Sequence, residues 1–259
     1  MKKFIFLFLC LISLLWAIIY YIKPYYIPAV KQTGLIVSKH DDDTIRIGFI
    51  GDSWAAGHKP VKCIIDSLVE AQSGHSTIVR IEGISGMTSK NIYYSMFRNN
   101  EVKDIIEWGP NFCVICAGIN DSDRKMGRNF YKNNMRLIIE LLLENNIVPV
   151  ILEIPSYDIY FSFKRRDRMV KMRYLLSMFV TWSKMDCIED YRNAYIELLN
   201  ENGWTNRVVT IWCKDWNPEG FRDIRGLYDE GLMHLNKRGY HVLDSCIAEK
   251  IAKKASASF

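Results

Sequence analysis

The sequence has no large excess of charge of either sign, and its only long uncharged apolar run lies at the N-terminus. Its 259 residues carry 34 lysines and arginines against 29 aspartates and glutamates, a net charge of +5. Lys2, Lys3 and Lys23 flank the apolar run, which leaves +2 for everything after Lys23. So small an excess of positive charge does not favour binding to nucleic acid.

Cysteine is also scarce. Seven cysteines at irregular spacing are too few for a disulfide scaffold in a chain of this length. Cys113 and Cys116 have the C-x-x-C spacing, which can indicate redox or metal chemistry. They fall within an expected buried strand, where alternation sends them to opposite faces. We therefore expect buried structural thiols, with redox use as the alternative. No histidine, cysteine or aspartate cluster has zinc spacing, and we expect no metal and no cofactor.

Residues 4–22 form an apolar run whose only clearly polar member is Ser13. As a helix it would extend roughly 28 Å, about one hydrocarbon core. A cleaved signal peptide is the competing interpretation. Its apolar region should be shorter, and no small-x-small site follows this run. We predict a single-pass signal-anchor over residues 1–23. The numbers of positive charges on its two sides are nearly equal, so the positive-inside rule does not decide its orientation.

The rest of the chain divides into a short linker and one domain. Residues 24–43 contain prolines, a glycine and an acidic run, which is typical of a stalk. The expected strands are residues 44–50, 77–81, 112–117, 148–154 and 208–212. The expected helices are residues 61–71, 91–98, 129–144, 165–183, 187–200 and 237–253. This alternation predicts an α/β domain over residues 44–259, with a parallel sheet and helices on both faces.

Ligands of such sheets bind beyond the carboxyl ends of the strands. The expected strands are followed by Gly51-Asp52-Ser53, by a loop with Gly86, and by Gly118-Ile119-Asn120-Asp121, and His234 precedes the last helix. A serine at a strand-to-helix turn and a histidine that takes its proton are the parts of an acyl-transfer site. Amides of Ser53 and Gly86, with the Asn120 side chain, could stabilise an oxyanion.

These four blocks, in this order, resemble the SGNH hydrolases, also called the GDSL family, from Gly51 to His234. The resemblance implies a flavodoxin-like three-layer sandwich and cleavage of an ester or acyl transfer from one. It also implies that Ser53 is the nucleophile and His234 the base. Ser53, Gly86 and Asn120 would form the oxyanion hole.

One position departs from the family pattern. The family usually has an aspartate three residues before the histidine, and here that residue is Gly231. Asp229 and Glu230 lie five and four residues before His234, and either could orient the imidazole. We favour Asp229, while Glu230 or a Ser-His dyad stays open.

Simpler structural roles compete with these assignments. Ser53 could cap the helix that follows it, and Asn120 could be a turn former. Gly86 could merely permit a positive φ. The basic residues 164–168 are typical of a solvated helix face, with a contact to anionic glycan or lipid headgroups as the alternative.

The sequence thus predicts a membrane-anchored serine esterase of the SGNH type. We expect an O-acetyl ester on a cell-surface glycan as the substrate, with the catalytic domain on the non-cytosolic side of the membrane. The alternatives are an O-acetyltransferase or lipid esterase with the same site, or a non-catalytic glycan-binding or scaffolding module.

Overall fold

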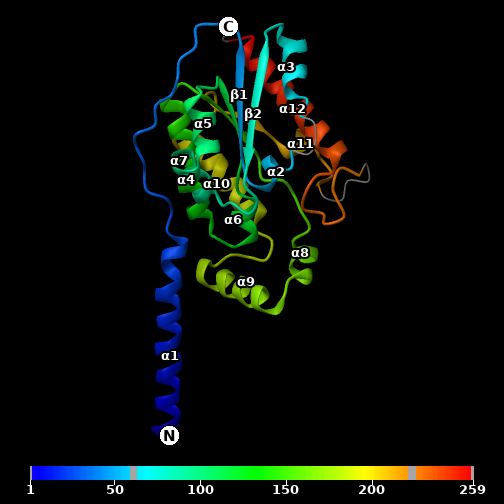
Figure 1. The fold of residues 1–259 in the computed structure, drawn as a ribbon. Coiled ribbons are helices and arrows are strands. Elements are labelled where there is room, and N and C mark those ends of the chain that lie inside the picture. The colour runs from blue at the N-terminus through cyan, green and yellow to red at the C-terminus, as the bar shows by residue number, and fades with distance from the viewer. Residues whose placement is uncertain (1, 59–62, 221–225, 258–259) are drawn as a thin grey trace.

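The computed structural model describes residues 2–58, 63–220 and 226–257, and its centre is a five-stranded sheet (Figure 1). The strands are β1 (Ile45–Gly51), β2 (Thr77–Gly83), β3 (Phe112–Cys116), β4 (Val148–Leu152) and β5 (Val209–Ile211). All pairings are parallel, in the order β2-β1-β3-β4-β5. This is the strand order of flavodoxin-like sheets.

Helices cover both faces of the sheet, which makes three layers (Figure 1). One layer contains α4 (Ser89–Arg98), α5 (Asn100–Glu107), α7 (Arg128–Glu144) and α10 (Ile188–Glu201). The other contains α3 (Ile65–Ser73) and α12 (Lys237–Ala255), which pack against each other. Because the central strands are covered on both faces, every residue of β1 and β3 is buried. The predicted three-layer α/β fold is confirmed.

The short helices lie at or beyond the carboxyl ends of the strands. They are α2 (Ser53–Ala56), α6 (Ile119–Asp123), α8 (Ile159–Arg165) and α11 (Cys213–Trp216). The longer α9 (Arg168–Thr181) follows α8 at the same edge of the domain (Figure 1). These elements surround the region where the sequence places its functional residues.

The helix expected over residues 165–183 is observed as α9, which begins three residues later at Arg168, whereas α8, which ends at Arg165, was not expected. Arg166 is extended, with ψ near 151°, and the Asp167 side chain accepts a hydrogen bond from the Val170 amide. An aspartate in this position satisfies a free N–H group at the start of a helix. The expected helix at 61–71 lies partly outside the described residues, and α3 begins at Ile65.

Residues 24–43, predicted to be a stalk, run along the surface of the domain. The Ala29 amide donates to Asn134 Oδ1, and the Gln32 amide donates to the Tyr93 hydroxyl. Farther along, the Ser38 amide donates to the carbonyl of Glu107. Contacts with α4, α5 and α7 therefore hold the linker against one helical layer.

Helix α1 (Lys2–Ile22) extends away from the domain, as Figure 1 shows. The large apolar side chains of α1 whose burial the structure describes are exposed, with Phe4 at 81% and Trp16 at 69%. The predicted membrane span is not confirmed. Among the residues that the structure describes, no helix is both long and apolar enough to cross a bilayer.

Cys113 and Cys116 both lie in β3, and both are buried free thiols. Burial raises the pKa of each thiol well above its usual value. Because the thiolate is the reactive form, this environment disfavours redox chemistry. The prediction of buried thiols is confirmed.

A buried His58–Asp244 pair joins the segment after α2 to helix α12. The Nε2 atom of His58 lies 2.8 Å from Asp244 Oδ1, and both side chains are fully buried. The second carboxylate oxygen accepts from the Ile64 amide at 3.3 Å. The pair thereby ties the chain on either side of residues 59–62 to α12.

We predict that Asp244→Ala lowers the free energy of unfolding by about 3 kcal/mol, because it leaves buried donors without their acceptor. Urea unfolding followed by tryptophan fluorescence measures this change. The neighbouring exposed Ser245→Ala should stay within about 0.5 kcal/mol of the wild type. Equal effects of the two substitutions would contradict a stabilising role for the pair.

Candidate active site

Ser53 is the first residue of α2, directly beyond the carboxyl end of β1. The Asp52 side chain caps this helix by accepting from the Trp54 amide at 3.0 Å. The structure therefore assigns the capping role to Asp52 and leaves the Ser53 hydroxyl for other partners. The tight approach of β1 to β3 requires Gly51, since a Cβ there would lie 2.4 Å from the carbonyl oxygen of Cys116.

His234 is presented by a short hairpin before α12. An antiparallel bridge joins Tyr228 and Leu235, and the Asp229 amide donates to the His234 carbonyl. The Trp54 indole N–H donates to the Met233 carbonyl at 3.2 Å, which ties the hairpin to α2.

As a result, Nε2 of His234 lies 2.9 Å from Ser53 Oγ, across 181 positions of sequence. This is hydrogen-bonding distance between a nucleophile and its base.

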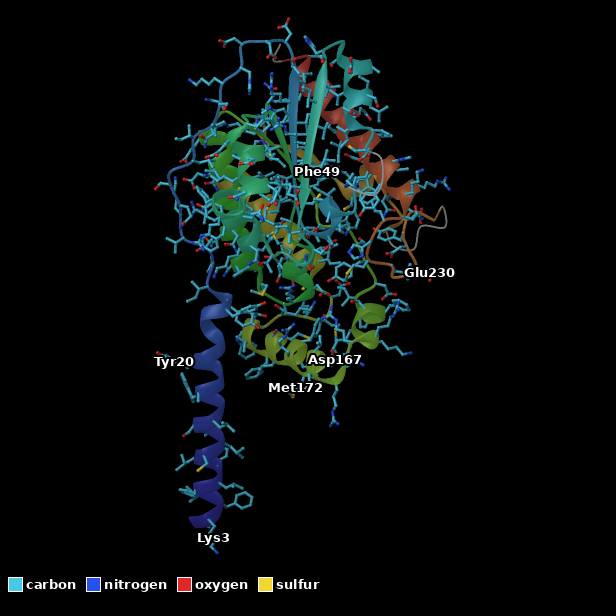
Figure 2. All side chains as sticks on the ribbon, viewed as in Figure 1. Lys3, Tyr20, Phe49, Asp167, Met172 and Glu230 are labelled. Carbon is cyan, nitrogen blue, oxygen red and sulfur yellow. The ribbon has the colours of Figure 1, made fainter. Side chains whose placement is uncertain are left out.

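The acid nearest the imidazole is Asp229, whose Oδ2 lies 3.9 Å from His234 Nδ1. Its Oδ1 accepts from the Gly231 amide at 3.0 Å. A Cβ on Gly231 would lie 3.2 Å from that same oxygen, so the Asp229 carboxylate occupies the space beside position 231. Glu230 is exposed at the outer edge of the molecule (Figure 2). This geometry favours Asp229 over Glu230.

We predict that Asp229→Asn lowers kcat by about tenfold to a thousandfold, because the imidazolium formed during catalysis loses its counter-charge. The distance of 3.9 Å and the partial exposure of both groups place the effect below that of a buried triad acid. Steady-state hydrolysis of 4-nitrophenyl acetate measures it. Glu230→Gln is the matched control and should change kcat little; no effect of either substitution would indicate a Ser-His dyad.

Gly86 and Asn120 are brought next to Ser53 by hydrogen bonds of the Asn120 amide. Its Nδ2 donates to Asp52 Oδ2 at 3.2 Å and to the Met87 carbonyl at 3.0 Å. It thus joins the residue before Ser53 to the residue after Gly86. Gly86 has φ of +80°, a conformation that favours glycine. To bind an oxyanion, Asn120 must exchange one of these acceptors for the substrate oxygen.

Two buried carboxyl groups, those of Asp121 and Asp52, hold these loops; the sequence suggested at most a turn-forming role for Asp121 and no positioning role for either. The Asp121 side chain accepts from the Ser89 amide at 2.8 Å and from the Ser89 hydroxyl at 2.5 Å, which fixes the loop that carries Gly86. Burial raises the pKa of Asp121 to about 6 and that of Asp52 to about 7. In the sequence, Asp52 directly precedes Ser53 and Asp121 directly follows Asn120. This adjacency is the signal from which their positioning role could have been inferred.

Trp54, the neighbour of Ser53, is buried and packs edge-on against Trp216 and Tyr228. Its environment is that of a core residue that supports the hairpin with His234. In the described part of the chain, no group of three or more histidine, cysteine, aspartate or glutamate side chains could hold a metal ion.

Comparison with known proteins supports the same chemistry. The model of the GDSL-like lipase/acylhydrolase family matches residues 49–242, which include all four sequence blocks. None of the curated protein sequences matches the chain.

Solved structures show the same fold at low sequence identity. A lipase/acylhydrolase from Enterococcus faecalis is 17% identical, with a TM-score of 0.57 over 81% of this chain and 96% of that one. An acetyl xylan esterase is 18% identical, with a TM-score of 0.53 over 81% and 99%. The esterase EstA from a Pseudoalteromonas species, in a structure inhibited by monoethylphosphonate, is 15% identical, with a TM-score of 0.53 over 82% and 98%.

Proposed function

This chain belongs to the GDSL-like lipase/acylhydrolase family and acts on ester bonds, and we propose that its substrate is an O-acetyl ester on a cell-surface glycan. Family membership favours an enzyme over the non-catalytic module that the sequence left open. The observation that carries the proposed mechanism is the contact of 2.9 Å between Ser53 Oγ and His234 Nε2.

In the proposed mechanism, Ser53 Oγ attacks the ester carbonyl carbon while His234 Nε2 takes the hydroxyl proton. The backbone amides of Ser53 and Gly86 and the side-chain amide of Asn120 donate to the oxyanion of the tetrahedral intermediate. His234 then gives its proton to the departing alcohol oxygen, and Asp229 stabilises the imidazolium. Water attacks the resulting acyl-enzyme and releases the acid.

The choice of an acetyl ester on a glycan rests on analogy. One protein of the same fold is named an acetyl xylan esterase, so this fold supports that reaction. Acetate release from acetylated xylan, measured beside release of fatty acid from lysophosphatidylcholine, tests the proposal. Faster turnover of the lipid ester would contradict the glycan proposal and indicate that the enzyme is a lipid esterase. Appearance of the acetyl group on an added sugar instead of in water would indicate an O-acetyltransferase.

We further propose that α1 attaches the domain to a membrane, with the catalytic domain on the non-cytosolic side. The support is the exposure of the apolar side chains of α1, which an isolated domain in water would not favour. In the sequence, aromatic residues near the end of the helix match the residue types enriched at membrane interfaces.

Helix α9 carries a second exposed apolar surface near the end of α1. The Tyr26 hydroxyl, just after α1, donates to Ser177 Oγ of α9 at 2.6 Å, so the two elements are neighbours. Four large apolar side chains of α9 and its C-cap residue lie three or four positions apart and are 52–86% exposed: Met169, Met172, Leu175, Phe179 and Trp182. Met172 points away from the domain in Figure 2. Basic residues flank this surface, as in helices that lie on anionic membranes.

Flotation of the full chain with liposomes that contain phosphatidylglycerol tests attachment. Aspartate substitutions at Phe4, Leu7 and Leu11 should abolish flotation, and Met172→Asp should weaken it. Ile78→Asp, a comparably exposed apolar position on β2, should leave it unchanged. Protease added to spheroplasts that express the chain should digest the domain if it is outside the cytosol, and protection would contradict this placement.

A further inference from the structure

A cavity of about 420 Å³ lies between α9, the end of α6 and the short helix η1 (Lys23–Tyr26). Its wall includes Tyr25, Tyr26 and Tyr174, and three arginines, Arg124, Arg166 and Arg173. We call it the arginine pocket. The described residues that line it include no aspartate or glutamate.

The pocket reaches the proposed oxyanion hole through Arg124. Arg124 ends α6, and its amide donates to the carbonyl of Asn120 in the same short helix. Its guanidinium extends over Gly86, since a Cβ on that glycine would lie 3.1 Å from Arg124 Nη2. A ligand bound by the Arg124 guanidinium would therefore lie next to Gly86, one of the proposed oxyanion-hole residues.

The three guanidinium groups differ in their charged neighbours: burial raises the pKa of the Asp121 carboxyl, and the charge of Arg124 partly offsets this rise without an ion pair between them. Arg166 forms an ion pair with Asp123. Among the described residues, the side chains of Arg124 and Arg173 form neither a hydrogen bond nor an ion pair. The rest of the wall consists of three tyrosines, Val170, Leu176 and Ser177. Guanidinium groups in such a partly apolar wall attract anions more strongly than they would in open water.

We propose that the arginine pocket binds an anionic group, a carboxylate or a phosphate, on the alcohol portion of the ester substrate. This inference rests on the proposed function, since a two-carbon acetyl group cannot fill the cavity and the occupant must belong to the other portion of the substrate. Planar guanidinium groups suit both anions, because each can accept two parallel hydrogen bonds. The pocket thus selects acidic substrates over neutral ones.

The test uses two pairs of esters that differ in charge. One pair is 2-O-acetyl methyl glucuronoside and 2-O-acetyl methyl glucoside, and the other is lysophosphatidylglycerol and lysophosphatidylcholine. We expect kcat/KM to favour the anionic member of one pair by about tenfold. Preference within the first pair identifies an acidic glycan as the source of the anion, and preference within the second identifies a lipid headgroup.

Arg124→Gln and Arg173→Gln should each reduce that preference several-fold, mainly through KM for the anionic ester, and Arg124→Lys should restore part of it. Arg165→Gln, a charge change on α8 outside the pocket wall, should leave the preference unchanged. The preference is the ratio of kcat/KM for the anionic ester to kcat/KM for the neutral ester, measured with the same variant. A general loss of activity lowers both values equally and leaves this ratio unchanged. Equal turnover of both members of both pairs by the wild type, or a preference that survives both glutamine substitutions, would overturn the proposal.

The two proposals fail differently. If the enzyme cleaves lysophosphatidylglycerol in preference to lysophosphatidylcholine but cleaves neither acetyl sugar, the glycan substrate is wrong and the anionic subsite stands. If it cleaves both acetyl sugars at equal rates and does not discriminate between the two lysolipids, the glycan substrate stands and the subsite is wrong.

Discussion

Replacing Ser53 with alanine is expected to lower kcat for 4-nitrophenyl acetate by about 10⁴-fold or more and to abolish labelling by a fluorophosphonate probe. The substitution removes the oxygen that lies 2.9 Å from His234 Nε2. It leaves the Asp52 cap of α2 in place, so the fold should persist. Mass spectrometry of the labelled wild type should locate the adduct on Ser53.

His234→Ala should also abolish labelling, because the hydroxyl then has no base. The double variant should be no worse than either single variant, since the two residues act as one unit. Ser67→Ala and His40→Ala change exposed residues of the same types and should label normally. Labelling that persists after Ser53→Ala would assign the nucleophile to another residue.

Replacing Asn120 with alanine is expected to lower kcat by about 10²–10³-fold, the usual effect of removing one oxyanion-hole donor. The value of KM should change little, because the donated hydrogen bond strengthens as the oxyanion forms. The experiment is steady-state kinetics at saturating and limiting ester. A raised KM with an unchanged kcat would contradict this role and indicate a contact with the ground state.

Asn120 also donates to Asp52 and to the Met87 carbonyl, so loss of activity could follow from a disturbed loop. Thermal unfolding separates the two effects. A variant that unfolds at the same temperature as the wild type has kept its fold, so its loss of activity is assigned to the missing hydrogen-bond donor. Asn120→Asp keeps the shape and places an acceptor where the oxyanion forms, and we expect it to be at least as inactive. Asn133→Ala, on the exposed side of α7, is the control.

The sheet could be predicted because its strands are buried on both faces. A strand covered by helices on each side needs apolar residues at nearly every position, so residues 112–117 were recognisable as a continuous apolar run, and residues 44–50 as strand-like although they include Arg46. The observed strands are Ile45–Gly51 and Phe112–Cys116. The predicted elements and their order are therefore close to those of the structure, with differences mainly at the ends.

The polar segments were harder to predict. The break between α8 and α9 depends on the Asp167 cap, and the many charged residues around it give no apolar periodicity. Helix α5 (Asn100–Glu107) was not predicted either, although the Asn99 side chain caps it by accepting from the Val102 amide. Between α8 and α9 a local hydrogen bond decides the boundary, and hydrophobic spacing does not show it. In α5 the buried Val102, Ile105 and Ile106 do have helical spacing, but the helix is only eight residues long.

By itself the sequence determined the fold class, the order of the four motifs and the identities of Ser53 and His234 as candidates, because each depends on local pattern. Only the tertiary structure decided which acid lies beside the imidazole and that Arg124 extends over Gly86. The first follows from how the hairpin before α12 folds back on itself, and the second from how α6 packs against the loop after β2. Sequence spacing constrains a residue's neighbours along the chain, whereas packing selects its neighbours in space.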